Sequence, residues 1–195
     1  MKKRYRTTNH YKVDSMKIIA FTGMPCSGKS EAVQIAKDKG IPMVRMGDLV
    51  WEETKRQGKP LDDKNVGAVA TSMREKHGMD IWARRTYEKI QSMKQSSCLV
   101  IDGVRNKEEI DYFRKKLGNE FLVIAIEAPD ELRRKRALAR KRTDDSTSLK
   151  DLEERDKREI KWGIKNVIAL ADIVLTNNGS LKDFQHHVTT VLHDL

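Results

Sequence analysis

The chain has 195 residues, of which 39 are Lys or Arg and 29 are Asp or Glu, so its formal net charge is +10. This length predicts one domain with room for a small insertion. The sequence contains no run of about 18 apolar residues, which excludes a transmembrane helix. The first fifteen residues lack the apolar stretch of a secretory signal, and two cysteines are too few for a disulfide framework. We therefore expect a cytoplasmic protein with no membrane partner.

Positive charge is concentrated in two segments. Residues 1–12 carry five basic side chains and no acid, so we interpret residues 1–15 as a mobile basic arm ahead of one domain over residues 16–195. Such an arm could attract nucleic acid electrostatically, but a solvated tail is the favoured interpretation. Residues 131–142 hold seven basic side chains against one acid, which indicates an anionic ligand. Residues 150–161 instead balance five bases with five acids, mostly in i,i+4 pairs, and predict a solvated helix face.

The predicted elements alternate between apolar strands and amphipathic helices. Continuous apolar runs predict five strands, at residues 17–22, 41–46, 98–101, 121–127 and 173–176. Helical patterns cover residues 29–39, about three stretches between 48 and 95, then 106–117, 129–142, 149–170 with a bend near Gly163, and 180–192. This alternation predicts a single α/β domain whose parallel sheet is covered on both faces.

The loop after the first predicted strand carries the strongest chemical signal. It fits the phosphate-binding pattern G-x-x-x-x-G-K-[ST] at every required position, with a strand before it and a helix after it. Its glycines let backbone N–H groups surround phosphates, so the loop predicts a site for the phosphate chain of a nucleotide. Lys29 is expected to act on the β- and γ-phosphates, and the Ser30 hydroxyl to bind Mg²⁺. The cofactor-binding residues are Gly23, Met24, Pro25, Cys26, Ser27, Gly28, Lys29 and Ser30.

A second part of the predicted site follows the strand at 98–101. Asp102 comes directly after this apolar run, at the sheet edge where open α/β sheets bind ligands. There its carboxylate can orient the Mg²⁺ shell, directly or through water. Arg105, just beyond, is a candidate phosphate ligand.

The class of nucleotide-binding protein can be narrowed further. GTPases that carry this phosphate-binding loop usually recognise guanine through the sequence N-K-x-D. The nearest match in this chain, Asn106-Lys107-Glu108-Glu109, lacks the Asp. The chain also leaves little room for modules that couple hydrolysis to motion. A phosphotransferase acting on a small-molecule acceptor is therefore favoured.

Several motifs together resemble the nucleoside-monophosphate kinase superfamily. They are the loop at 23–30, Met46-Gly47-Asp48, Asp102-Gly103-Val104-Arg105, the pair Arg136/Arg140, and Ala171-Asp172 with Asn177-Asn178-Gly179-Ser180. Adenylate kinase and dephospho-CoA kinase are similar, and residues 16–195 most closely resemble archaeal adenylate-kinase-related P-loop proteins without an assigned reaction. The resemblance implies a P-loop NTPase three-layer sandwich with a five-stranded parallel sheet of order 2-3-1-4-5. It also implies a helical acceptor-binding arm at 48–95 and a short lid at about 133–150.

The resemblance also assigns residues. Asp48 matches an acceptor-binding position, and Arg136 and Arg140 match two lid arginines, so Lys29, Arg105, Arg136 and Arg140 form the predicted catalytic set. The sequence departs from adenylate kinase at Trp51, where that enzyme has an acceptor-phosphate arginine.

Other residues in these segments receive more ordinary interpretations. Arg74, within the acceptor interval, joins Asp48 and Arg105 as a predicted substrate-binding residue. The remaining basic side chains of 131–142 are expected to be solvated, apart from Arg142 as a reserve. Trp51, Trp82 and Trp162 are expected in the core.

Two classes of function follow. The first is an ATP- and Mg²⁺-dependent kinase of a nucleotide or nucleotide-like acceptor, with a dephospho-CoA kinase-like enzyme as the alternative. The second is a nucleotide-dependent RNA-binding or regulatory ATPase that uses the basic arm. RNA binding with a steep salt dependence would indicate the second class, and transfer to one small acceptor would indicate the first. The sequence leaves the acceptor, the preference for ATP or GTP and the oligomeric state open.

Overall fold

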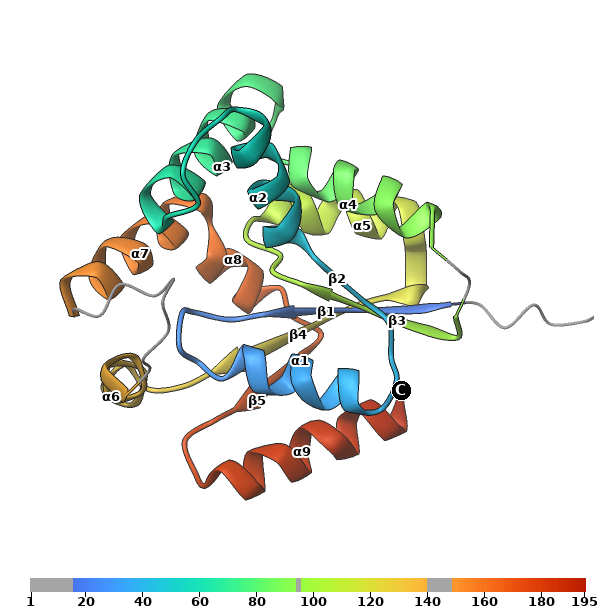
Figure 1. The fold of residues 1–195 in the computed structure, drawn as a ribbon. Helices are drawn as coiled ribbons and strands as arrows, with labels where there is room; N and C mark the ends of the chain where they lie inside the picture. The colour runs from blue at the N-terminus through green and yellow to red at the C-terminus, as the bar shows by residue number, and fades with distance from the viewer. Residues whose placement is uncertain (1–15, 94–95, 140–148) are drawn as a thin grey trace, which may run out of the picture.

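The computed structural model describes residues 16–93, 96–139 and 149–195. Its strands form one parallel sheet of order β2-β3-β1-β4-β5, which confirms the predicted fold class and strand order (Figure 1). Parallel strands need crossover connections, and the helices between them supply the outer layers. The strands are β1 (Lys17–Thr22), β2 (Met43–Arg45), β3 (Cys98–Asp102), β4 (Phe121–Glu127) and β5 (Ile173–Thr176).

Helices cover both faces of the sheet, and each face has its own apolar core. On one face α1 (Lys29–Asp38) and α9 (Leu181–Asp194) pack against each other, and Phe184 of α9 is buried with Phe21 of β1. The other face is covered by α4 (Ile81–Gln91), α5 (Lys107–Leu117) and α8 (Ile164–Ala169) (Figure 1). Because the central strands are buried on both sides, they read as continuous apolar runs instead of alternating ones.

The remaining helices gather around the carboxyl ends of the strands (Figure 1). The interval between β2 and β3 contains three helices, as predicted. Asp62 caps the second of them, since its side chain accepts a hydrogen bond from the Asn65 N–H at 2.7 Å. The helices at this end are α2 (Met46–Arg56), α3 (Asp63–His77), α6 (Asp130–Ala139) and α7 (Leu149–Trp162).

Two of the strands have bounds that differ from the predicted ones. The strand predicted at 41–46 is only Met43–Arg45, because α2 begins at Met46 and Pro42 has no N–H to donate to the sheet. The strand predicted at 98–101 extends to Asp102, so this carboxylate belongs to β3 itself. The predicted bend near Gly163 is confirmed, since this residue has φ 107° and separates α7 from α8.

Some predictions fall outside the described residues, namely the basic arm at 1–15, Arg140 and Arg142. Within the described part of the chain, no helix is both long enough and apolar enough to cross a membrane.

Glu53 links α2 to α4 and gives the fold a testable dependence on pH. Its side chain is 2% exposed and accepts hydrogen bonds from Arg56 in α2 at 2.8 Å and from Arg85 in α4 at 2.9 Å. Bonds from Arg56, and then from Gln57 and Arg85, lower the pKa of Glu53 to about 2, although burial opposes this shift.

A carboxylate with a lowered folded-state pKa stabilises the fold above its unfolded pKa, and this contribution disappears as the pH falls toward the folded value. Between about pH 5 and about pH 2, we expect the free energy of unfolding to fall by about 2–3 kcal/mol more in the wild type than in Glu53→Gln. Urea unfolding of both proteins at the two pH values measures this difference. Equal losses in the two proteins would contradict the prediction.

Candidate functional site

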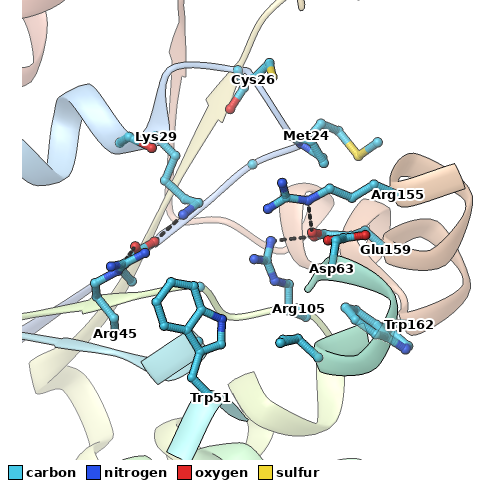
Figure 2. Close-up of a pocket in the computed structure, with 18 of the residues that line it drawn as sticks. Met24, Cys26, Lys29, Arg45, Trp51, Asp63, Arg105, Arg155, Glu159 and Trp162 are labelled. Atoms are coloured by element: carbon cyan, nitrogen blue, oxygen red, sulfur yellow. Dashed lines mark hydrogen bonds and ion pairs between the residues drawn. The ribbon is translucent and has the colours of Figure 1, made fainter. Parts of the chain in front are cut away.

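A cleft lies at the carboxyl ends of β1, β2 and β3. Its cavity has a volume of about 210 Å³. The whole predicted phosphate loop, residues 23–30, forms one wall. The opposite walls come from β2 and β3, from α2 and α3, and from α7, so segments far apart in sequence meet around one space (Figure 2).

The loop adopts a backbone that two of its glycines make possible. Gly23 has φ 148° and Gly28 has φ 112°. A Cβ on Gly23 would lie 2.4 Å from the carbonyl oxygen of Ile126, and a Cβ on Gly28 would lie 2.1 Å from Nδ2 of Asn177. The loop leads directly into α1, whose first N–H groups have no partner inside the helix. This geometry is suited to an anion such as a phosphate chain.

Lys29 and Asp102 both line the cleft and form an ion pair. The sheet register explains it, because Asp102 pairs with Phe21, which lies two residues before the loop. Burial lowers the pKa of Lys29, and attraction to Asp102 offsets this only in part. Burial alone would raise the pKa of Asp102, but the nearby charge of Lys29, with those of Arg105 and Arg45, holds it below its usual value. The ion pair therefore favours the charged form of each group.

Two arginines of α6 hold the carbonyl groups of the loop. Arg133 donates to the carbonyl of Pro25 at 2.9 Å and to both carboxylate oxygens of Asp156 in α7. Arg136 donates to the carbonyl of Ser27 at 3.2 Å and to the carbonyl and side-chain oxygens of Asn177. These two bonds fix the backbone of the loop from the side of α6. The expectation that the residues around Arg136 are solvated is wrong for Arg133, which is 4% exposed.

Arg133 and its neighbour Arg134 provide a matched test of this support. Arg133→Met should weaken ATP binding by about 10-fold or more, because a buried arginine that holds both the loop and Asp156 is lost. Arg134→Met should change binding less than twofold, since this side chain is 54% exposed and pairs with Glu153 at the surface. Calorimetric titration with ATP measures both, and equal effects of the two substitutions would contradict the role of Arg133.

The far side of the cleft carries two more arginines and a buried glutamate. Arg105 pairs with Glu159 of α7, and Nε of Arg155 lies 3.6 Å from the same carboxylate (Figure 2). The backbone N–H of Arg105 also donates to Glu109 at 2.7 Å. Arg105 is therefore fixed at both its backbone and its side chain, with guanidinium N–H donors left for a ligand. Glu159 corrects the expectation of a solvated helix at 150–161, since it is 2% exposed.

The predicted site residues are only partly brought together. Lys29, Ser30, Asp102 and Arg105 all line the cleft. Three other predicted residues do not line this cleft. Asp48 pairs with Arg45 at 3.5 Å beside the cleft, Arg74 is buried in a pair with Glu109, and Arg136 lies behind the loop. The roles predicted for these three, and the lid at about 133–150, stay predictions, and Arg140 lies outside the described residues.

The three tryptophans differ in how far they lie in the core. Trp82 is fully buried, as expected, and Trp162 is partly buried and packs against the core. Trp162 also lines the cleft, as does Trp51, which is not part of the core. Arg45, which lines the cleft beside Trp51, was not predicted. The available signal was position, because Arg45 ends a strand next to the one that carries Asp102.

The residues in the cleft fit a magnesium nucleotide. The hydroxyl of Ser30 and the carboxylate of Asp102 are oxygen donors of the kind that Mg²⁺ prefers, and this ion commonly takes its other ligands from water and phosphate. Among the described residues, no group of three or more His, Cys, Asp or Glu gathers into an all-protein metal site. The hydroxyl of Ser27, buried and without a hydrogen-bond partner in the described structure, is a further donor within the loop.

Sequence comparison places the chain among archaeal proteins. A family model described as an AAA domain matches residues 22–153. A UPF0200 protein of Thermoplasma volcanium is 49% identical over 177 residues, which cover 91% of this chain and 97% of that protein. One from Methanosarcina barkeri is 45% identical with similar coverage. A UPF0200/UPF0201 protein of Archaeoglobus fulgidus is 46% identical, but the match spans only 55% of its length.

Solved structures share the fold. TT1252 from Thermus thermophilus superposes with a TM-score of 0.64 at 22% identity, covering 92% of this chain and 98% of that one. Shikimate kinase from Aquifex aeolicus superposes with a TM-score of 0.50 at 18% identity, covering 90% of this chain and 96% of that one. These likenesses confirm a P-loop kinase-like fold, and the archaeal relatives confirm the resemblance seen in the sequence. The chain therefore belongs to the UPF0200 family.

Proposed function

We propose that this protein is an ATP- and Mg²⁺-dependent phosphotransferase that moves the γ-phosphoryl group to a small nucleotide or nucleotide-like acceptor. The observation that carries the proposal is the shared cleft, in which the phosphate loop faces a wall built from α2, α3 and α7. A nucleotide held by the loop would direct its terminal phosphate toward this second wall. A phosphoryl acceptor needs such a place beside the nucleotide.

The charges in the cleft support phosphoryl transfer. Lys29 and Arg105 enter it from opposite sides, so both can neutralise negative charge on the transferring group. Asp102 and Ser30 would hold Mg²⁺, which supplies positive charge at the phosphate oxygens. The ion pair between Lys29 and Asp102 orients the ammonium before the nucleotide binds. Glu159 does the same for Arg105.

Residues 48–95 are the proposed acceptor-binding arm. Three of the cleft-lining segments come from this interval, namely Trp51 in α2, the stretch Leu61–Asp63, and Val66 in α3. Apolar and aromatic side chains therefore face the charged loop across the cleft. This combination suits an acceptor that has both an apolar part and a polar reacting end.

A phosphoryl-transfer screen tests the proposal. The protein is incubated with Mg²⁺ and γ-labelled ATP in the presence of each nucleoside monophosphate, dephospho-CoA or RNA. We expect the label to appear in one small acceptor, and we expect RNA not to raise the rate of this transfer. Release of label only as inorganic phosphate, stimulated by RNA in a salt-dependent way, would instead support a regulatory ATPase.

A further inference from the structure

We propose that Arg45 binds an anionic group of the acceptor, a phosphate or a carboxylate, with Trp51 supporting its guanidinium. This assignment rests on the proposed function, because it names the chemistry of the second substrate in the same cleft. Arg45 ends β2, and its sheet partner in β3 is Asp102. The strand therefore delivers this arginine to the wall of the cleft next to the reacting centre (Figure 2).

Arg45 is held more loosely than Arg105 across the cleft. Its closest acidic partners are Asp48 at 3.5 Å and Asp102 at 3.6 Å. Asp48 is itself half exposed, and Asp102 is already paired with Lys29. Arg105 instead has the buried carboxylate of Glu159 as its partner. The side chain of Arg45 is 48% exposed, so its planar fork of donors is accessible to a carboxylate or phosphate.

Trp51 gives this arginine a fixed support. The guanidinium carbon of Arg45 lies 5.9 Å from the centre of the Trp51 ring. A cation over an aromatic face is attracted to it, and the contact limits the positions that a long side chain can take. Figure 2 shows the ring standing between Arg45 and Arg105, so an acceptor that meets Arg45 also meets this aromatic surface.

The arrangement also accounts for a departure in the sequence. Adenylate kinase has an acceptor-phosphate arginine at the position of Trp51, and a tryptophan cannot replace its charge. In this chain we place the charge at Arg45, six residues earlier at the end of β2, with the tryptophan ring beside it. An acceptor held here would approach the loop from the β2 side of the cleft.

The site can be tested without turnover by titrating the full chain with inorganic phosphate, AMP or adenosine while its tryptophan fluorescence is recorded. The part of the fluorescence change that is lost in Trp51→Phe reports on Trp51. We expect inorganic phosphate and AMP, but not adenosine, to change this signal in the wild type. Arg45→Met should raise both dissociation constants about 10-fold or more, and Arg45→Lys should have a smaller effect, because a lysine lacks the bidentate fork. The exposed Arg134→Met is the control.

Steady-state kinetics with the acceptor found in the transfer screen provide the second readout. Arg45→Met should raise the KM of that acceptor about 10-fold or more, and the KM of ATP less than about threefold. If the wild type transfers phosphate to none of the acceptors, yet Arg45→Met weakens the binding of inorganic phosphate, the proposed function fails and the anion site stands. If Arg45→Met and Arg134→Met bind phosphate and AMP equally well, the anion site is overturned, whether or not transfer occurs.

Discussion

Lys29→Ala should lower the rate of phosphoryl transfer by about 100-fold or more, because a single group that stabilises charge in the transition state is commonly worth about 2.7–4 kcal/mol. The ammonium lies under the phosphate loop and is already oriented by Asp102. The substitution removes this positive charge from beside the position that the phosphates would occupy. The measurement is turnover with saturating ATP and Mg²⁺, and more than about a tenth of wild-type activity would contradict the role.

The ion pair complicates this experiment in a way that a second variant resolves. Lys29 is not an exposed loop residue, so its removal leaves the buried carboxylate of Asp102 without its ion-pair partner, with Arg45 at 3.6 Å and the charge of Arg105 as weaker substitutes. Lys29→Ala should therefore also be less stable. Lys29→Ala/Asp102→Asn removes the unpaired charge and should recover stability. Because Asp102 is itself a proposed Mg²⁺ ligand, the turnover of this double variant is compared with that of Asp102→Asn alone, and it should be lower. Equal turnover of these two variants would show that Lys29 acts only on the fold.

Arg74→Met should lower the free energy of unfolding by about 3–5 kcal/mol, the usual cost of removing one partner from a buried ion pair. Nη2 of Arg74 lies 3.0 Å from Glu109, whose side chain is fully buried, and its guanidinium carbon lies 4.5 Å from the Trp162 ring. Glu109 also accepts the backbone N–H of Arg105. Loss of Arg74 therefore leaves a buried carboxylate without its cation, next to the cleft.

Urea unfolding measures this effect, and the exposed pair between Lys107 and Asp111 supplies the control. Lys107→Met should cost less than about 1 kcal/mol, because exposed pairs contribute little. The double variant Arg74→Met/Glu109→Gln should lose less stability than the two single losses added together. A loss below about 1 kcal/mol for Arg74→Met would contradict the structural role of this pair.

The sheet could be predicted closely because burial on both faces leaves a simple signal. The strands at 17–22, 121–127 and 173–176 have the predicted bounds, since each apolar run is bounded by polar residues, glycine or proline. The phosphate loop could be predicted because its pattern of two glycines followed by Lys and Ser, between a strand and a helix, is specific to this loop conformation. The strand at 41–46 was harder, because α2 begins without any connecting turn.

The acceptor side of the cleft could not be predicted in the same way. In α7, Leu152 and Glu159 are seven residues apart and both are buried, but charged neighbours hide this face in a sequence of balanced acids and bases. Glu159 is buried because Arg105, contributed by a distant loop, is there to pair with it. Arg133 likewise looks like one of many basic residues until the fold brings it to the loop. Such pairs depend on tertiary contacts that no local pattern records.

Helix α7 connects these parts of the cleft. Its Asp156 holds Arg133 and through it the phosphate loop, while its Arg158 donates to the carboxylate of Asp63 at the start of α3 at 2.8 Å. Glu159 holds Arg105 beyond β3. One helix thereby fixes groups on the nucleotide side and on the proposed acceptor side relative to each other, which is the positioning that phosphoryl transfer requires.

The most direct test follows the labelled γ-phosphoryl group in a single turnover. Wild-type protein in excess over γ-labelled ATP is mixed with Mg²⁺ and the panel of small acceptors, and ADP and labelled product are quantified together. We expect ADP and one phosphorylated acceptor to appear in equal amounts at the same rate, and Lys29→Ala to form neither. If ADP accumulates only together with free phosphate, at a rate that no acceptor changes, the proposed function is contradicted.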